Sequence, residues 1–197
     1  MDWLRTRVSD AFGRHSAPVM RMPDKLVEHE HWYLAHGGFP NRRGQALIQD
    51  HVAVRFVDGR VAGMLPLVEL LEKLDIDDGP LPNRQRSRDC TPLAEHLPAA
   101  VEYLRGHLKR ARDEELARRR PSLAAELARL GEQRAHHQDQ LELELNQSRA
   151  AEGQKQRKRE VREAAIAEHF QEYERWLRDS VETEDEPYMQ ILAVITG

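Results

Sequence analysis

The stretch HEHWYLAHGG, residues 29 to 38, holds three histidines and one glutamate, which are ligand types found at zinc sites. Zinc binds about four such ligands, and they must converge on the ion tetrahedrally. If the stretch is a β-strand, His29 and His31 point to one side of it and His36 points to the other. The three imidazoles then cannot converge on one ion unless the strand bends.

A second pair of metal ligands is hard to find elsewhere in the chain. The HExxH motif is absent because Tyr33 occupies the position of its second histidine, and the HxxEH motif is absent as well. His136 and His137 are adjacent in a helical segment, where neighbouring side chains diverge by about 100°. We therefore interpret the strand histidines as surface or half-buried residues, and we expect no metal and no cofactor.

Two groups of basic residues could contact the phosphates of DNA. Arg42 and Arg43 follow Asn41 in a turn, and turns often carry function. The second group opens the last long helical segment and consists of Lys155, Arg157, Lys158, Arg159 and Arg162. Because glutamates are interleaved with this second group, a solvated helix surface with ion pairs is the alternative interpretation. The formal net charge is −4 and the sequence pI is about 6.2, so any DNA contact must be a local patch.

Signals of catalysis are absent from the sequence. It contains no GxxxxGK[ST] phosphate loop and no GxSxG motif, and Cys90 has no neighbouring histidine that would activate a thiolate. We expect no enzymatic activity. The single cysteine fits a reducing compartment, and no apolar run approaches the ~18 residues of a membrane span or resembles a signal peptide. These features favour a cytoplasmic protein without membrane contact.

The first part of the chain predicts a short helix and loop over 1–27, followed by a β-rich region over 28–80. HWYLAH reads as a strand and GGFPNRRG as a turn. QALIQDHVAVRFV reads as a second strand with Val52, Val54 and Phe56 on one face, and Asp58-Gly59 closes a hairpin into RVAGM. Leucines and a valine between 67 and 74 predict a short amphipathic helix.

Residues 91–181 predict a helical coiled-coil arm, because leucines recur at steps of three and four among Ala, Glu, Arg and Gln. Pro121 is expected to kink or break the first helix. A reversal between Asn146 and Gly153 would lay 122–150 against 154–180, and a turn near Gly131 is the competing choice. We interpret the tryptophans as core or seam anchors rather than as stacking surfaces: Trp3, Trp32 and Trp176.

The final segment, Tyr188 to Ile195, is almost continuously apolar and is bounded by Pro187 and Gly197. Such a run suits a strand buried on both faces of a sheet. Since the other predicted strands lie between 31 and 64, the chain must return after the arm to complete their sheet. The predicted fold class is α+β, a small β-sheet built from the N-terminal hairpin plus the strand 187–197, with a long helical coiled-coil arm.

Three stretches together resemble the carboxyl-terminal region of large bacterial SNF2-type helicases, including helicases of phage-defence islands of the DISARM type. They are HEHWYLAHGGFPNRRGQALIQDHVAVRFVDGRV, the Glu/Arg/Leu helical region, and YERWLRDSVETEDEPYMQILAVITG, which together cover the chain from about residue 28 onward. The resemblance implies an accessory module, because the ATP-binding motifs of that family belong to motor domains that this chain does not contain.

The resemblance further implies that helicase motor domains, or another subunit of a helicase system, are the partners, with non-specific DNA contact. Either a separated piece of such an ATPase or a stand-alone protein that works beside one would fit. The alternative is a stand-alone coiled-coil interaction module that forms a homodimer through its arm and has no role with nucleic acid.

Overall fold

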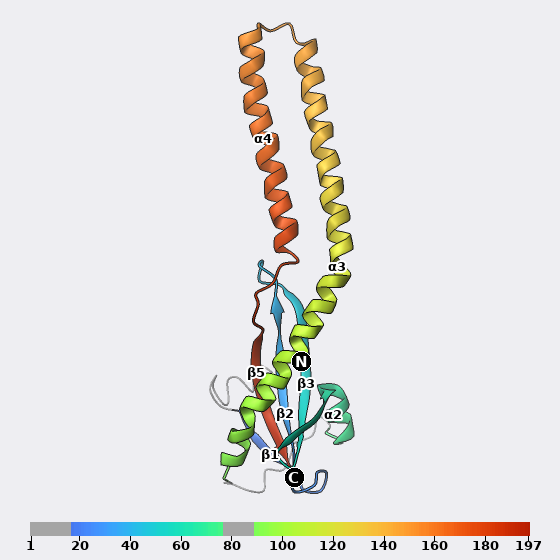
Figure 1. Cartoon of the computed structure of the whole chain (residues 1–197), viewed down its shortest axis with the longest axis vertical. Coiled ribbons are helices and arrows are strands. Elements are labelled where there is room, and N and C mark those ends of the chain that lie inside the picture. The colour runs from blue at the N-terminus through green and yellow to red at the C-terminus, as the bar shows by residue number, and fades with distance from the viewer. Residues whose placement is uncertain (1–16, 77–88) are drawn as a thin grey trace. The chain divides into compact units, whose positions relative to one another are not determined.

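The computed structural model describes residues 17–76 and 89–197 of the chain, so the predicted N-terminal helix lies outside the described residues (Figure 1). The described part is an α+β fold, as predicted. Its elements in chain order are β1 (Val19–Arg21), β2 (Glu30–Pro40), β3 (Ala46–Val57), β4 (Arg60–Pro66), α2 (Leu67–Lys73), α3 (Thr91–Gln147), α4 (Glu152–Asp179) and β5 (Tyr188–Thr196).

The described residues form two compact units. The sheet unit comprises those of Met1–Phe39, Ile48–Arg112 and Asp185–Gly197, and the arm unit comprises Pro40–Leu47 and Asp113–Glu184. The long helix α3 runs through both units, and its first part, up to Arg112, belongs to the sheet unit. This division differs from the predicted boundary, which assigned all of 91–181 to the arm.

The five strands form one sheet in the order β1-β5-β2-β3-β4. Strand β5 pairs antiparallel with β2 and parallel with β1, so the predicted return of the chain to the sheet of Val52 to Phe56 is confirmed. Burial on both faces holds for the second half of β5, from Ala193 onward, whereas its first half is partly exposed. The three-residue strand β1 was not predicted, because so short a segment has no recognisable period.

The two hairpins are set by their turns. Between β3 and β4, Asp58 and Gly59 have φ values of 49° and 73°, the left-handed conformation that a two-residue hairpin turn of this type requires. The predicted turn GGFPNRRG is too long, because β2 continues through Pro40 and only residues 41–45, the tip loop, connect it to β3. Gly38 belongs to the strand, where a Cβ atom would overlap the carbonyl oxygen of Ile48.

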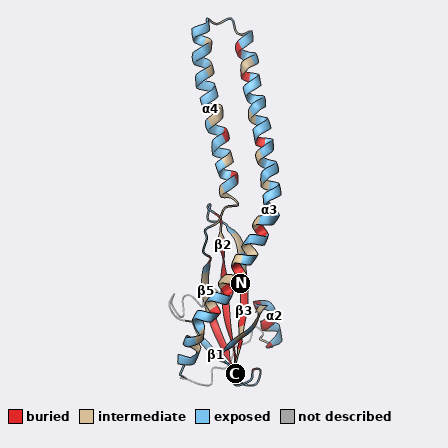
Figure 2. Cartoon of the chain, viewed as in Figure 1, coloured by how far each residue is buried: buried red, intermediate tan, exposed pale blue. Residues whose placement is uncertain are grey.

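Each face of the sheet is covered by a helix of the sheet unit. The start of α3 covers one face with Ala100, Leu104 and Leu108, which pack against a set that contains the predicted residues Val52, Val54 and Phe56. Helix α2, with Leu67 and Leu70, and the residue that follows it, Leu74, cover part of the other face. Burial of each such leucine contributes about 1.5–3 kcal/mol, and Figure 2 shows the strands between the helices as the most buried part of the chain.

The sequence predicted a kink or a break at Pro121, and the break is wrong, because α3 continues through this residue and spans 57 residues. Proline removes one backbone donor, which leaves the carbonyl of Ala117 without its usual intrahelical partner. Both Ala117 and Pro121 are exposed, so water can bind that carbonyl. The surface position makes the proline tolerable, although it still costs stability.

The arm unit contains an antiparallel pair formed by the second part of α3 and by α4 (Figure 1). The chain reverses between Gln147 and Glu152, which confirms the predicted reversal and places Gly131 inside α3. Leu130, Phe170 and Leu177 form the buried contact between the helices. Within residues 17–76 and 89–197, no helix is both long enough and apolar enough to cross a membrane.

Candidate functional site

The tip loop, which carries the predicted residues Arg42 and Arg43, is held in place by the buried side chain of Asn41. Its Oδ1 atom accepts hydrogen bonds from the backbone N–H groups of Arg43 (3.1 Å) and Gln45 (2.9 Å), while its Nδ2 atom donates to the carbonyl of Ser180 (2.9 Å). The backbone N–H of Arg42 donates to the carbonyl of Glu182 (2.9 Å). These bonds fix the loop against the segment that follows α4, and all of them lie within the arm unit.

Arg43 lies against an exposed pair of aromatic rings. Its guanidinium carbon is 4.6 Å from the centre of the Trp176 ring, a cation–π contact. The Trp176 ring stacks on Tyr173 with the centroids 5.5 Å apart and an angle of 18° between the planes. Tyr173 is 44% exposed and Trp176 is 45% exposed. The interpretation of Trp176 as a core or seam anchor is therefore wrong, because the next residue, Leu177, takes the buried position.

Arg42 forms an ion pair with Glu182 at 2.8 Å, and both side chains are about half exposed. Exposed ion pairs of this kind are worth at most about 1 kcal/mol, because water screens both charges. A phosphate group could therefore replace Glu182 as the partner of Arg42 at little cost. The tip loop thus presents two guanidinium groups next to two stacked aromatic rings.

The basic group on α4 is engaged differently. Lys155 pairs with Glu152 at 3.3 Å, Arg159 with Glu142 at 2.9 Å and Arg162 with Glu144 at 3.1 Å. Within the described part of the chain, Arg157 and Lys158 form no ion pair. The solvated-surface interpretation thus accounts for three of the five residues, and two of the pairs join α4 to α3.

The two predicted basic groups do not form one surface. Arg159 and Trp176 both lie on α4, and the rise of a helix separates them by about 25 Å along its axis. One short stretch of nucleic-acid backbone therefore cannot contact both basic groups at once. The tip loop and the start of α4 are therefore separate candidates within the arm unit.

A groove between α3 and α4, here called the arm groove, encloses about 540 Å³. Its lining combines three imidazoles with an amide, a phenol and two apolar side chains, and it contains no carboxylate. The lining residues are Leu130, Gln133, His136, His137, His169, Phe170 and Tyr173. Tyr173 belongs both to the arm groove and to the stack with Trp176, so the groove leads into the surface beside Arg43.

The arm groove does not present a metal site. Among the described residues, no three His, Cys, Asp or Glu side chains are grouped so that they could hold a metal ion. The rings of His136 and His137 have centroids 6.5 Å apart, and Nε2 of His136 is hydrogen-bonded to Gln140 (3.0 Å). The prediction that the protein binds no metal stays a prediction that elemental analysis can test.

His31 and His36 lie on opposite faces of β2, as predicted, but both are buried, so the interpretation of these two as surface or half-buried residues is wrong. His29 is exposed and precedes β2, whereas His31 packs against both Phe56 and His96, with 5.1 Å between ring centroids in each case, and the rings of Phe56 and His96 are 5.5 Å apart. Its Nε2 atom lies 3.2 Å from Nδ1 of His96. His36 packs instead against His51, at 4.4 Å between centroids.

Burial sets the protonation of the groups beneath α3. Burial, together with the neighbouring His96, lowers the pKa of His31 to about 4. Burial also raises the pKa of Tyr33 to about 12, and its hydroxyl donates to the carbonyl of Leu93. Both side chains are neutral at pH 7, and their contacts stabilise the packing of α3 on the sheet.

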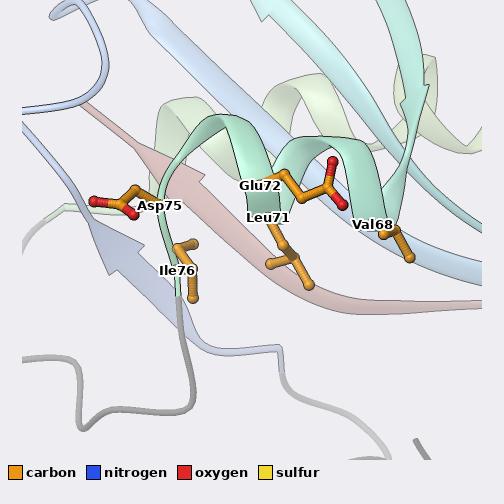
Figure 3. A pocket seen from close by; sticks show the side chains of 5 residues that line it. All are labelled: Val68, Leu71, Glu72, Asp75 and Ile76. Atoms are coloured by element: carbon orange, nitrogen blue, oxygen red, sulfur yellow. The ribbon is translucent and has the colours of Figure 1, made fainter.

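A shallow hollow of about 340 Å³ lies beside α2 (Figure 3). It is lined by Val68, Leu71 and Ile76 together with two carboxylates, those of Glu72 and Asp75. Figure 3 shows the two carboxylates pointing away from one another, so they cannot bind one cation together. Asp75 already pairs with Lys25 at 3.3 Å. Nothing in this hollow points to a ligand.

No protein-family model, curated protein or solved structure matches the chain. We therefore infer function from the side chains themselves. The tip loop with its aromatic neighbours is the surface whose composition points most directly to a ligand, because it combines fixed cations with exposed rings.

Proposed function

We propose that the chain is a non-catalytic accessory module of an SNF2-type DNA-dependent ATPase and that it contacts DNA through the tip loop. The observation that carries the DNA contact is the position of Arg43 over the exposed Trp176 ring, beside Arg42 on a loop fixed by Asn41. The accessory role rests on the resemblance of the three sequence stretches to such helicases. The partner is a motor domain or a system subunit in the cytoplasm, in the setting of phage defence.

In this role the tip loop, which is bound to the segment that follows α4, carries the DNA contact, and the rest of the arm is a coiled-coil spacer. The net charge of −4 does not oppose it, because charges beyond about 10 Å are screened at 0.1 M salt. Two or three phosphate contacts give weak, sequence-independent affinity, with a Kd of about 10⁻⁴ to 10⁻⁶ M that rises with salt. The ion-paired residues of α4 contribute less than the loop, since binding there must first break pairs between the helices.

The test compares two charge-removal variants of the full chain by fluorescence anisotropy with labelled DNA at low salt. Changing Arg42 and Arg43 to glutamine should abolish most of the binding. Changing the basic group on α4 to glutamine should weaken it less, and the variant consists of Lys155→Gln, Arg157→Gln, Lys158→Gln, Arg159→Gln and Arg162→Gln. Circular dichroism must show that both variants remain helical. If the wild type does not bind at about 50 mM salt, the DNA role is refuted.

One observation favours the second candidate, a stand-alone interaction module that forms a homodimer through its arm. Leu143 and Val161 are 59% and 70% exposed on the arm helices, where a partner helix could cover them. Sedimentation over a range of concentrations tests this candidate. A dimer that dissociates when both residues are changed to glutamine would support it, whereas a monomer at all concentrations would exclude it.

A further inference from the structure

Three exposed rings share one face of α4. His169, Tyr173 and Trp176 are separated by four and three residues, a spacing that places side chains on one side of a helix. The rise of the helix separates neighbouring members by about 6 and 4.5 Å along its axis. Phe170 and Leu177 point inward to α3 and form the buried contact between the helices. The three exposed rings take no part in that contact.

The groove behind these rings lacks negative charge, whereas the exposed carboxylate of Glu172 lies on the same face of α4 as the rings. The lining of the arm groove contains three imidazoles and no carboxylate, although 32% of the chain's residues are charged. The guanidinium of Arg43 lies at the Trp176 end of the row of rings. The pair formed by Arg42 and Glu182 near that end is neutral as a whole. An anion that approaches from the groove side therefore meets no carboxylate in the lining and one available cation, Arg43.

We propose that this row of rings, with the arm groove behind it and the tip loop at its end, binds unpaired bases of single-stranded nucleic acid. The inference rests on the proposed function and adds the form of nucleic acid that is bound. Bases stack on exposed aromatic rings regardless of sequence, while nearby cations bind the backbone phosphates. The row is long enough for about two or three nucleotides, given its spacing.

Arg43 has a defined part in this binding. In the free protein it covers the Trp176 ring, and a contact of this kind at an exposed site is weak. When a base stacks on the ring, the guanidinium moves to the adjacent phosphate, where its donors fit two oxygens at once. Duplex DNA cannot use the site in this way, because its base faces are already covered by neighbouring base pairs. It retains only the phosphate contacts.

The experiment measures binding of the full chain to a labelled oligothymidylate of about 12 nucleotides and to a duplex of the same length. We expect the single strand to bind roughly tenfold more tightly. Tyr173→Ala and Trp176→Ala should each weaken binding of the single strand far more than binding of the duplex, and so remove most of that preference. Tyr173→Phe and Trp176→Phe keep a ring at each position and should retain the preference, which separates stacking from a structural effect.

The outcomes distinguish this inference from the proposed function. Equal binding of the two forms, unaffected by the alanine variants, would overturn the inference and leave DNA contact by the tip loop standing. Binding of neither form would overturn both. If the alanine variants instead dissociate a homodimer, the rings form an interface between two copies, and the inference is wrong. Because both side chains are nearly half exposed, the thermal unfolding midpoint should change little in any of these variants.

Discussion

The side-chain amide of Asn41 donates a 2.9 Å hydrogen bond to the carbonyl of Ser180, a residue 139 positions later in the chain. The same side chain accepts two backbone N–H groups of its own loop, so one residue both shapes the turn and attaches it to the end of α4. Asparagine side chains in turns commonly accept hydrogen bonds from nearby backbone N–H groups in this way. The bond to Ser180 converts a local turn into a fixed support for Arg42 and Arg43.

The two functions of Asn41 can be separated by substitution. Asn41→Asp keeps an oxygen that accepts the loop N–H groups but loses the donor to Ser180, while Asn41→Ala loses both. We expect each variant to lower the free energy of unfolding, by about 1 kcal/mol, because the partly buried carbonyl of Ser180 loses its donor. Amide hydrogen exchange should accelerate at Arg43 and Gln45 in the alanine variant and much less in the aspartate variant. Equal acceleration in both would contradict the assignment of roles.

The stability of the sheet unit should depend on pH through His31. Its pKa is lowered from 6.5 to about 4 by burial and by His96. At pH 7 and above the imidazole is neutral in both states, so protonation does not affect unfolding. As the pH falls below about 6.5, the unfolded state binds a proton that the folded state rejects. The free energy of unfolding therefore decreases, by roughly 3 kcal/mol in total when the pH reaches about 4.

Urea unfolding at pH 7, 5.5 and 4.5 measures this effect, and a His31→Phe variant removes the ionisation while retaining a ring against Phe56. As the pH falls, the free energy of unfolding should decrease more for the wild type than for the His31→Phe variant. The exposed His29 provides the matched control, so His29→Gln should track the wild type. If the free energies of unfolding of the wild type and of His31→Phe differ by the same amount at all three pH values, His31 is solvated in the folded state.

The elements that the sequence predicted are those with strong local signals. Alternation of apolar residues located β3, the Asp58-Gly59 pair located its turn, and the continuous apolar run from Tyr188 predicted an internal strand. The reversal before Glu152 was visible because the leucine period lapses there. In each case the information lies within about ten neighbouring residues.

The features that were missed depend on distant partners or on exposure. Strand β1 has three residues, and its pairing with β5 is what makes it a strand. Local propensity at Pro121 predicted a kink or a break, but the helix is not broken there, because the long helix on both sides outweighs one missing hydrogen bond. Trp176 was interpreted as a core or seam anchor, but it is 45% exposed, while its neighbour Leu177 takes the buried position.

Two glycines give opposite predictions for the same substitution. At Gly38 a Cβ atom would overlap the carbonyl of Ile48, whereas at Gly131 there is open space around the position. Gly38→Ala should therefore destabilise the fold by about 1–3 kcal/mol, because the hairpin backbone must separate. Gly131→Ala should stabilise α3 by about 1 kcal/mol through helix propensity. Thermal unfolding of both variants checks the signs, and a neutral Gly38→Ala would show that β2 and β3 are farther apart than the structure places them.

Pro121 offers the most direct test that α3 is continuous. A proline inside a helix costs up to about 3 kcal/mol relative to alanine, because it removes a hydrogen bond and crowds the preceding turn. If α3 is helical on both sides of this position, Pro121→Ala restores the bond to Ala117 and should raise the free energy of unfolding of the arm by about 1–3 kcal/mol. Ser122→Ala, at the adjacent exposed position, is the matched control, and it should raise the free energy of unfolding by only a few tenths of that amount. Circular dichroism melting gives the stability, and hydrogen exchange at residues 118–120 reports on the turn itself. An unchanged melting curve with fast exchange at these amides would mean that the helix is interrupted at Pro121 in solution.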